Sequence, residues 1–382
     1  MIYAIGNFIG IEVILLKRLL AFFTVLLMLL PLGNIALADA SDDFFNDSVF
    51  LGDSLTVGLE SFAKSQRKKD RNFLGDAQFL AESGYAIDDT DLPDGHEDHP
   101  EYDGQRLQPQ KSLAAMDPEK VFITLGVNDV NGKEKTLAQN YKALIRSIKK
   151  AVPDAKLYMI AVFPMTARKE SSSRNNSKID SINVRLLSLA MSEGVTFIDF
   201  TDSLKEDGVL KAEYSRDDYV HLSNDGYSVW TKSLYAFARF QLAKSDVNTG
   251  TATIVNVKNY VNARKKASSS SKLVTTIKKG EKVTILESAS GNWYKVSYEG
   301  ETMYVYGKYL SVGGSSGLVG EVDNVSKDAN LRELPDTESN RAAKVKKGTQ
   351  LSVSKDYFNS NWYQVEYKGE TAYISRELLE LQ

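Results

Sequence analysis

A repeat in the last third of the chain constrains its fold more than any other feature of the sequence. Asn262-Ala263-Arg264 returns 68 residues later as Asn330-Leu331-Arg332, and Trp293-Tyr294 returns 69 residues later as Trp362-Tyr363. Around both copies, short runs rich in Val, Ile and Tyr are separated by Gly, Ser and Asn, which is the pattern of strands joined by turns. The repeat therefore predicts two homologous all-β modules in tandem.

We place the first module at residues 251–312 and the second at residues 319–382. A Gly- and Ser-rich linker, residues 313–318, separates them, and a short polar linker, residues 244–250, precedes the first module. Because such linkers join parts that fold separately, we expect a cut within residues 244–248 to release the preceding domain intact. The first module is basic, with ten Lys and Arg against four Asp and Glu.

Residues 41–243 show a different pattern, in which short apolar runs alternate with longer amphipathic ones. This alternation predicts strands followed by crossover helices, and hence a three-layer α/β domain whose mainly parallel sheet is covered on both faces. The expected strands are Ser48–Leu51, Ala77–Ala81, Val121–Leu125, Leu157–Val162 and Thr196–Phe200. The expected helices are Leu55–Gln66, Gln110–Ala115, Lys135–Ala151, Lys178–Glu193 and Asn224–Ala243.

Residues 1–40 have the pattern of a secretory signal peptide. Lys17-Arg18 precede the uncharged apolar run Leu19–Leu32, and small residues offer cleavage after Ala38 or Ala40. A retained membrane anchor is the alternative, but charged side chains interrupt any clean span of ~20 apolar residues. We therefore expect an exported protein that meets a membrane only through this segment.

The overall composition fits packed globular domains and excludes several classes of protein. Hydrophobic residues make up 42% and charged residues 25% of the chain, which gives no support to disorder, collagen or coiled coil. The formal net charge of -3 provides no field that would gather nucleic acid. The chain contains no Cys, which excludes disulfides, thiol nucleophiles and thiolate metal sites.

Four short segments carry polar residues where parallel strands are expected to end. Gly52-Asp53-Ser54-Leu55 follows the first strand and opens a helix, Gly84 follows the second strand, and Gly126-Val127-Asn128-Asp129 follows the third. Asp218-Tyr219-Val220-His221 lies between the last strand and the last helix. Since ligands bind at the carboxyl ends of strands in an open parallel sheet, we expect the four segments to converge on one rim.

These segments together supply the groups that acyl transfer requires. Ser54 is the candidate nucleophile, His221 the base that takes and returns its proton, and Asp218 the carboxylate that orients the imidazole. The expected oxyanion donors are the backbone N–H groups of Ser54 and Gly84 and the side-chain amide of Asn128.

The same segments resemble the SGNH or GDSL hydrolases, a family named after the Ser, Gly, Asn and His that stand here as Ser54, Gly84, Asn128 and His221. The resemblance runs over residues 42–244. It implies a flavodoxin-like α/β/α sandwich with a parallel sheet, and hydrolysis of esters without a metal or cofactor. A long polar stretch after Gly84 departs from smaller relatives, so we expect the mouth of the site to differ from theirs.

Two assignments near this set have alternatives. Asp217 adjoins Asp218 and could also approach the imidazole, but the spacing of three residues between Asp218 and His221 favours Asp218. Asp53 and Asp129 stand beside candidate site residues, and we expect them to tie loops together rather than to act on substrate.

Histidines and aromatic residues outside the set receive a structural interpretation. His96 and His99 stand in an acidic loop that invites comparison with a metal site, but no matching ligand pair exists elsewhere in the sequence. We therefore expect a solvated loop and no metal. Tyr227 and Trp230, on the last helix, are expected to pack in the core rather than to form a sugar platform.

The tandem modules resemble bacterial SH3-like (SH3b) domains, which are small all-β barrels. The resemblance rests on the Asn-x-Arg start, a Lys-Lys-Gly turn before a strand, and Trp-Tyr-x-Val followed by Gly-Glu and a final Tyr. Such domains commonly bind the cell wall in exported bacterial proteins, and aromatic and Lys side chains suit glycans and peptide stems. The alternative is that Trp293 and Trp362 are core or rim residues and the modules are spacers.

These features together predict a secreted serine esterase (EC 3.1.1.-), extracellular or cell-wall associated, that is tethered to peptidoglycan by its tandem modules. Its expected substrates are acylated carbohydrates, such as O-acetylated polysaccharides. A lipase or lysophospholipase is one alternative. A wall-binding protein with a vestigial hydrolase domain is another, against which the intact set from Ser54 to His221 argues.

Overall fold

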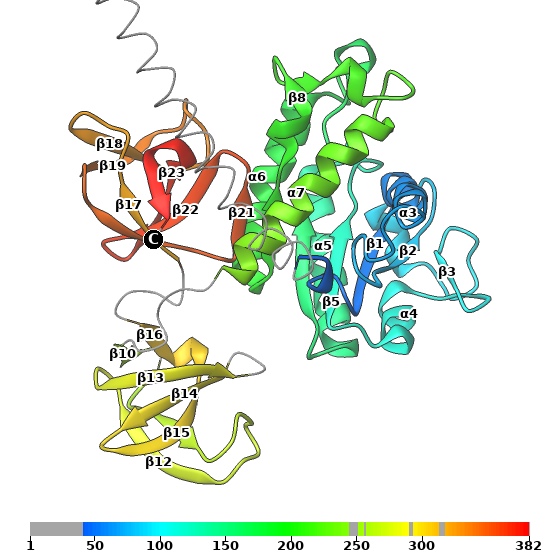
Figure 1. Cartoon of the computed structure of the whole chain (residues 1–382). Helices are drawn as coiled ribbons and strands as arrows, with labels where there is room; N and C mark the ends of the chain where they lie inside the picture. The colour runs from blue at the N-terminus through cyan, green and yellow to red at the C-terminus, as the bar shows by residue number, and fades with distance from the viewer. Residues whose placement is uncertain (1–40, 244–250, 256, 290–292, 313–317, 382) are drawn as a thin grey trace, which may run out of the picture.

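The computed structural model describes residues 41–243, 251–255, 257–289, 293–312 and 318–381 (Figure 1). The predicted signal peptide and linker 244–250 lie outside these residues, as does nearly all of linker 313–318. Within the described ranges, no helix is both long enough and apolar enough to cross a membrane.

Five parallel strands form the sheet of the α/β domain. They are β1 (Ser48–Gly52), β2 (Gln78–Ala81), β5 (Lys120–Thr124), β6 (Lys156–Ile160) and β7 (Thr196–Asp199). Their spatial order, β2-β1-β5-β6-β7, is the flavodoxin-like order in which the second strand flanks the first. The strands predicted from the sequence are confirmed, with ends that differ by at most two residues.

Five helices cover this sheet (Figure 1). They are α3 (Ser54–Gln66), α4 (Pro109–Met116), α5 (Glu134–Ala151), α6 (Asn176–Glu193) and α7 (Asn224–Leu242), which confirms the predicted helices. Helix α3 contacts α7, whereas α4 contacts α5 and α5 contacts α6, so the helices form two layers. Between the sheet and α7, the rings of Phe50, Phe122 and Tyr158 stack with centroids 4.6 Å apart on successive strands, while Phe237 of α7 packs edge-on against Phe122 and Tyr158. The predicted α/β/α sandwich is therefore present.

Two short hairpins stand in the connections that follow β2 and β7. The first pairs β3 (Glu101–Tyr102) with β4 (Gln105–Arg106), and the second pairs β8 (Lys205–Glu206) with β9 (Val209–Leu210). The connection that holds the first hairpin runs from β2 to α4 and includes the polar stretch after Gly84.

The two repeats fold alike, as the sequence predicts. The first module comprises β10 (Thr251–Ile254), β11 (Tyr260–Arg264), β12 (Leu273–Lys278), β13 (Lys282–Ala289), β14 (Trp293–Tyr298), β15 (Glu301–Tyr306) and β16 (Leu310–Val312). The second comprises β17 (Leu318–Val322), β18 (Asp328–Arg332), β19 (Arg341–Lys346), β20 (Gln350–Val353), β22 (Trp362–Tyr367), β23 (Glu370–Ser375) and β24 (Leu379–Leu381). Both antiparallel sheets have the same strand order.

The second module also supplies a strand to the α/β domain, which the sequence analysis did not predict. Strand β21 (Tyr357–Asn359) pairs in parallel with β7, so that Tyr357 lies opposite Phe197 and Asn359 opposite Asp199. Phe358 is 3% exposed and packs against Phe237 and Phe240 of α7. The sheet of the α/β domain is therefore extended by a strand from outside residues 41–243.

Polar and cationic contacts strengthen this junction. The ammonium of Lys355 donates to the carbonyls of Gln241 and Ala243 at the C-terminal end of α7, and the Gln241 amide donates back to the Lys355 carbonyl at 2.7 Å. The guanidinium of Arg376 lies 4.9 Å from the ring centroid of Phe358 and 5.6 Å from that of Phe240. Buried residues of the α/β domain and the second module form one core cluster, whereas the first module has a cluster of its own.

Candidate active site

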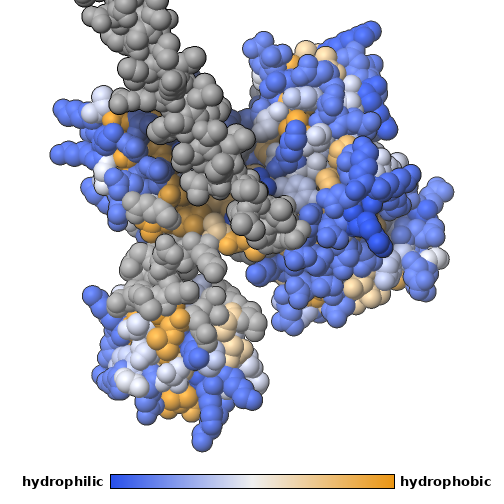
Figure 2. All heavy atoms as spheres, viewed as in Figure 1, coloured by the Kyte–Doolittle hydropathy of each residue, from blue (hydrophilic) through white to orange (hydrophobic). Residues whose placement is uncertain are grey.

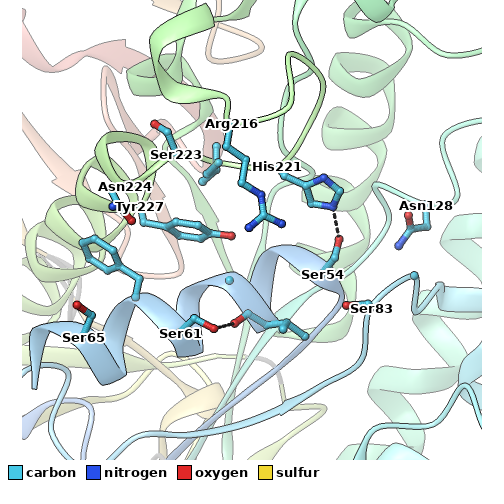
Figure 3. A pocket seen from close by; sticks show the side chains of 15 residues that line it. Ser54, Ser61, Ser65, Ser83, Asn128, Arg216, His221, Ser223, Asn224 and Tyr227 are labelled. Carbon is cyan, nitrogen blue, oxygen red and sulfur yellow. Dashed lines mark hydrogen bonds between the residues drawn. The ribbon is translucent and has the colours of Figure 1, made fainter.

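The structure brings Ser54 and His221 together at the carboxyl end of the parallel sheet. Ser54 is the first residue of α3, directly after β1, and its backbone position follows from the Asp53 side chain, which caps the helix by accepting from Leu55 N–H at 2.9 Å. The Nε2 atom of His221 lies 3.0 Å from Ser54 Oγ (Figure 3). This contact is short enough for the imidazole to take the hydroxyl proton.

Asp217, not Asp218, is the carboxylate beside this imidazole. Its Oδ2 lies 2.5 Å from His221 Nδ1, the ring nitrogen opposite the one that faces Ser54. Asp218 instead forms an ion pair with Arg168 at 2.7 Å. The prediction that Asp218 orients His221 is therefore contradicted by the geometry of this loop.

The local backbone explains why the nearer carboxylate turns away. Asp218 has a φ of +54°, a left-handed conformation that reverses the chain, and its carbonyl accepts from Thr166 Oγ1 at 2.7 Å. The preceding Asp217 forms a side-chain turn, in which Oδ1 accepts from Tyr219 N–H at 3.0 Å and Ser215 Oγ at 3.2 Å. The sequence spacing therefore identifies the segment correctly, but the turn inside the segment selects the other carboxylate.

These contacts keep Asp217 ionised. Burial raises its pKa, but the hydrogen bond and charge of His221, together with the bonds from Tyr219 N–H and Ser215, outweigh that effect and hold the pKa below its ordinary value. A carboxylate that accepts from Nδ1–H fixes the ring tautomer and stabilises the imidazolium that forms after proton transfer.

Gly84 and Asn128 line the same pocket as Ser54, which is where oxyanion donors are needed. Gly84 has a φ of +83°, and no atom stands within 4 Å of the position that a Cβ would occupy, so the space beside its backbone is open. The side-chain amide of Asn128 donates to the Tyr85 carbonyl at 3.0 Å, and the backbone carbonyl of Asn128 accepts from the Arg174 guanidinium at 3.4 Å. These two bonds hold Asn128 at the edge of the pocket.

Two carboxyl groups, one buried and one half-buried, lie beside the site residues. Asp53 caps its own helix, whereas Asp129 ties its loop to the loop of Ile87, as predicted for Asp129. Burial raises the pKa of Asp53 to about 7, although the bond from Leu55 N–H lowers it, and the nearby charge of Asp129 raises it further. Burial likewise raises the pKa of Asp129 to about 6, although this carboxyl accepts from Ile87 N–H at 3.1 Å. Neither residue lines the pocket.

The pocket beside Ser54 has a volume of about 910 Å³ and extends along α3 (Figure 3). Tyr227 forms part of its wall, and its hydroxyl donates to the Leu55 carbonyl at 3.1 Å. A Cβ at Gly58 would stand 1.7 Å from that hydroxyl, so only glycine fits there. Further residues that no sequence motif marks also line the pocket, namely Arg216, Ser61, Phe62, Ser65 and Asn224. The one sequence signal for them is the spacing of four residues between Ser61 and Ser65, which places both on one face of the expected helix.

The remaining predicted positions have structural roles. His99 is fully buried and contacts the Tyr85 hydroxyl at 3.1 Å and the Leu92 carbonyl at 2.9 Å, so the expectation of a solvated loop is wrong for this residue. His96 pairs with Asp98 at 3.3 Å on the surface. Tyr227 and Trp230 are buried in the core as predicted, with their rings stacked 6.0 Å apart.

Relatives among curated proteins match only part of this chain. The Listeria monocytogenes protein named "Probable endopeptidase p60" is 32% identical over 95 residues, which are 25% of this chain and 19% of that protein. The protein of the same name from Listeria welshimeri is 46% identical over 52 residues, 13% of this chain and 10% of that protein. The chain thus spans about a fifth or less of the length of these relatives.

Solved structures of low sequence identity are similar to about half of the chain. An acetylxylan esterase from Geobacillus stearothermophilus is 17% identical with a TM-score of 0.38, and the match covers 52% of this chain and 96% of that one. A lipase/acylhydrolase from Enterococcus faecalis is 17% identical with a TM-score of 0.37, and the match covers 50% of this chain and 93% of that one.

Family models match the α/β domain and both modules. The model of the GDSL-like Lipase/Acylhydrolase family matches residues 50–229, which include every residue of the site described above. The model of the bacterial SH3 domain matches residues 259–311 and 327–380. The α/β part of this chain is therefore a domain of the GDSL-like lipase/acylhydrolase family, and two bacterial SH3 domains follow it.

Proposed function

We propose that this protein is an exported serine ester hydrolase that removes acyl groups, such as acetyl, from carbohydrates at the bacterial cell wall. The observation that carries the proposal is the continuous chain of contacts from Asp217 Oδ2 through both ring nitrogens of His221 to Ser54 Oγ, at 2.5 and 3.0 Å. The pocket of about 910 Å³ beside that hydroxyl gives a substrate access to it.

The chemistry follows from this order of groups. Ser54 Oγ bonds to the ester carbonyl carbon while its proton passes to His221 Nε2, and the tetrahedral oxyanion meets the donors of Ser54, Gly84 and Asn128. The carbon–oxygen bond to the alcohol then breaks, and the alcohol leaves with the proton from His221. Water, deprotonated by the same imidazole, cleaves the acyl-enzyme and restores the Ser54 hydroxyl. Asp217 stays ionised throughout.

The SH3 domains support an address at the cell wall. The first of them carries ten basic side chains against four acidic ones, a balance that suits an anionic wall polymer. It also exposes Leu273 and Val274, and hydrophobic patches are visible on its surface in Figure 2. We expect the full chain to sediment with purified cell walls and a chain without residues 251–312 to stay in the supernatant. Equal sedimentation of both chains would contradict wall binding by the first module.

The esterase proposal is tested with p-nitrophenyl esters from acetyl to palmitoyl on the purified chain. Ser54→Ala removes the bond-forming atom and is expected to abolish hydrolysis with the fold retained. Ser61→Ala is the matched control, since Ser61 lines the same pocket while its hydroxyl donates to the Val57 carbonyl at 3.1 Å. Turnover by Ser54→Ala near that of the parent chain would contradict the proposal, and a preference for palmitoyl would favour a lipase instead.

The orienting carboxylate is tested by a second pair of variants. Asp217→Asn is expected to lower kcat by roughly 10⁴-fold, because an amide in place of the carboxylate favours the wrong imidazole tautomer. Asp218→Asn is the control, and its kcat should fall only slightly because the Asp218 carboxylate forms an ion pair with Arg168 and not with His221. The reverse order of effects would show that Asp218 approaches His221 in the working enzyme.

A further inference from the structure

A guanidinium lies in the pocket beside the candidate nucleophile. Arg216 lines the pocket, and its backbone N–H donates to the His221 carbonyl at 2.9 Å across the hairpin that holds the imidazole. Figure 3 shows the Arg216 side chain directed over α3, between Tyr227 and His221 and on the opposite side of Ser54 from Asn128. The backbone bond ties the position of this cation to that of the imidazole.

The surroundings leave this positive charge available to a ligand. Arg216 carries the only fixed charge among the residues that line the pocket. Within the described ranges, none of the ion pairs found includes Arg216, and the neighbouring Asp217 is occupied by His221 and Tyr219 N–H.

The position of Arg216 indicates which part of a substrate it would meet. His221 gives its proton to the departing alcohol, so groups on the His221 side of Ser54 face the alcohol part of the ester. Asn128, the expected oxyanion donor, lies on the other side of Ser54 in Figure 3. A guanidinium recognises carboxylate and phosphate oxygens through paired N–H donors.

We propose that Arg216 is an anion subsite that selects esters whose alcohol part carries a carboxylate or a phosphate near the acyl group. The proposal rests on the proposed ester hydrolysis and names the substrate class of that site. Ser65 and Asn224, which also line the pocket, offer neutral hydrogen-bonding groups to the hydroxyls of such an alcohol. An acylated acidic carbohydrate or polyol phosphate fits this combination.

The test compares three acetyl esters of similar size on the purified full chain. They are 4-acetoxybenzoate, 4-acetoxyphenyl phosphate and the neutral methyl 4-acetoxybenzoate, and the measured quantity is the ratio of kcat/KM for each anionic ester to that for the neutral one. We expect Arg216→Gln to lower this ratio roughly 10-fold or more, as for the loss of a charge-assisted hydrogen bond. Arg216→Lys should retain more of the preference for the phosphate ester than of the preference for the carboxylate ester. The reason is that an ammonium binds an anion as a point charge and lacks the planar pair of N–H donors of a guanidinium.

Controls distinguish an anion subsite at Arg216 from a purely structural role of this residue, and they distinguish failure of the subsite proposal from failure of the proposed ester hydrolysis. Arg239→Gln removes an exposed charge at the far end of α7 and should leave all ratios unchanged. Equal losses for all three esters in Arg216→Gln would overturn the subsite and indicate that Arg216 only holds the hairpin. Hydrolysis of every ester without any preference by the parent chain would also overturn it, whereas no hydrolysis of any ester would count against the proposed function.

Discussion

The two SH3 domains share a fold but differ in their relation to the enzyme. The first has its own core cluster, and its strand β13 (Lys282–Ala289) continues in one piece to pair with β14. In the second, the equivalent strand β20 stops at Val353, and the chain departs to form β21 against β7 of the hydrolase. The same domain thus serves once as a separate module and once as a structural part of the catalytic unit.

A few residues account for the difference. Tyr357-Phe358-Asn359 stand in the second module where the repeat has Ala289-Ser290-Gly291 in the first, and one extra residue, Ser360, follows. Arg376, whose guanidinium lies 4.2 Å from the Tyr363 ring centroid and also contacts Phe358, replaces Gly307. A large apolar side chain and a stacking cation therefore turn a hairpin surface into an interface.

The largest expected effect comes from deleting the second SH3 domain. Removal of residues 318–382 uncovers the edge of β7 and the faces of Phe237 and Phe240, so we expect an insoluble hydrolase or a Tm lower by roughly 10 °C or more. Removal of residues 251–312 should leave the Tm of the hydrolase unchanged. Calorimetry of both deletions measures the contrast, and equal Tm values would break the comparison.

Tryptophan fluorescence sharpens the same comparison without any deletion. The chain has three Trp residues, and one stands in each part: Trp230 in the hydrolase, Trp293 in the first module and Trp362 in the second. In variants that keep a single Trp, we expect Trp230 and Trp362 to report one common unfolding transition. Trp293 should report a separate one. If Trp293 and Trp362 reported one common unfolding transition and Trp230 a separate one, the two modules would pair with each other and not with the hydrolase.

A smaller effect is expected from one side chain of the interface. Phe358→Ala removes a ring that is 3% exposed and packed between α7 and Arg376, at a cost of about 3–5 kcal/mol, the usual range for a buried Phe. Tyr260→Ala is the control, since Tyr260 of the first module is 55% exposed. Urea unfolding followed by the fluorescence of Trp362 measures the free energy of unfolding of both variants. If Phe358→Ala lost no more than Tyr260→Ala, the interface would not form in solution.

The smallest expected effect comes from the protonation of Asp53 in the hydrolase. It tests whether a change in the stability of the hydrolase also changes the stability of the second module and leaves the first module unaffected. The pKa of Asp53 is raised to about 7 in the fold, so its protonation stabilises the protein at low pH, and this contribution is lost as the pH rises through 7. Between pH 6 and pH 8, the chain should lose on the order of 1 kcal/mol that Asp53→Asn, which keeps the helix cap, does not lose. The difference should appear at Trp230 and Trp362. Its appearance at Trp293 would contradict separate folding.

Much of this architecture could be predicted from the sequence because its patterns are long. Alternating strands and helices predict the parallel sheet with helices on both faces, and the resemblance to the SGNH hydrolases implies its flavodoxin-like arrangement. The four segments at strand ends converge on Ser54 and His221 as expected. Asp217 could not be preferred over Asp218, since the choice depends on a single left-handed residue inside the turn. Strand β21 could not be found either, because three residues carry no periodicity. Its one signal was the replacement of small residues by Tyr357 and Phe358 between otherwise similar repeats.

The central claim, that Ser54 is an activated nucleophile, is tested most directly by covalent labelling. A fluorophosphonate probe bonds to serine hydroxyls that an adjacent base deprotonates. We expect one adduct per chain, located at Ser54 by peptide mass spectrometry, absent in Ser54→Ala and retained in Ser61→Ala. An adduct at another serine, or ester hydrolysis that persists with Ser54 unlabelled, would contradict the account.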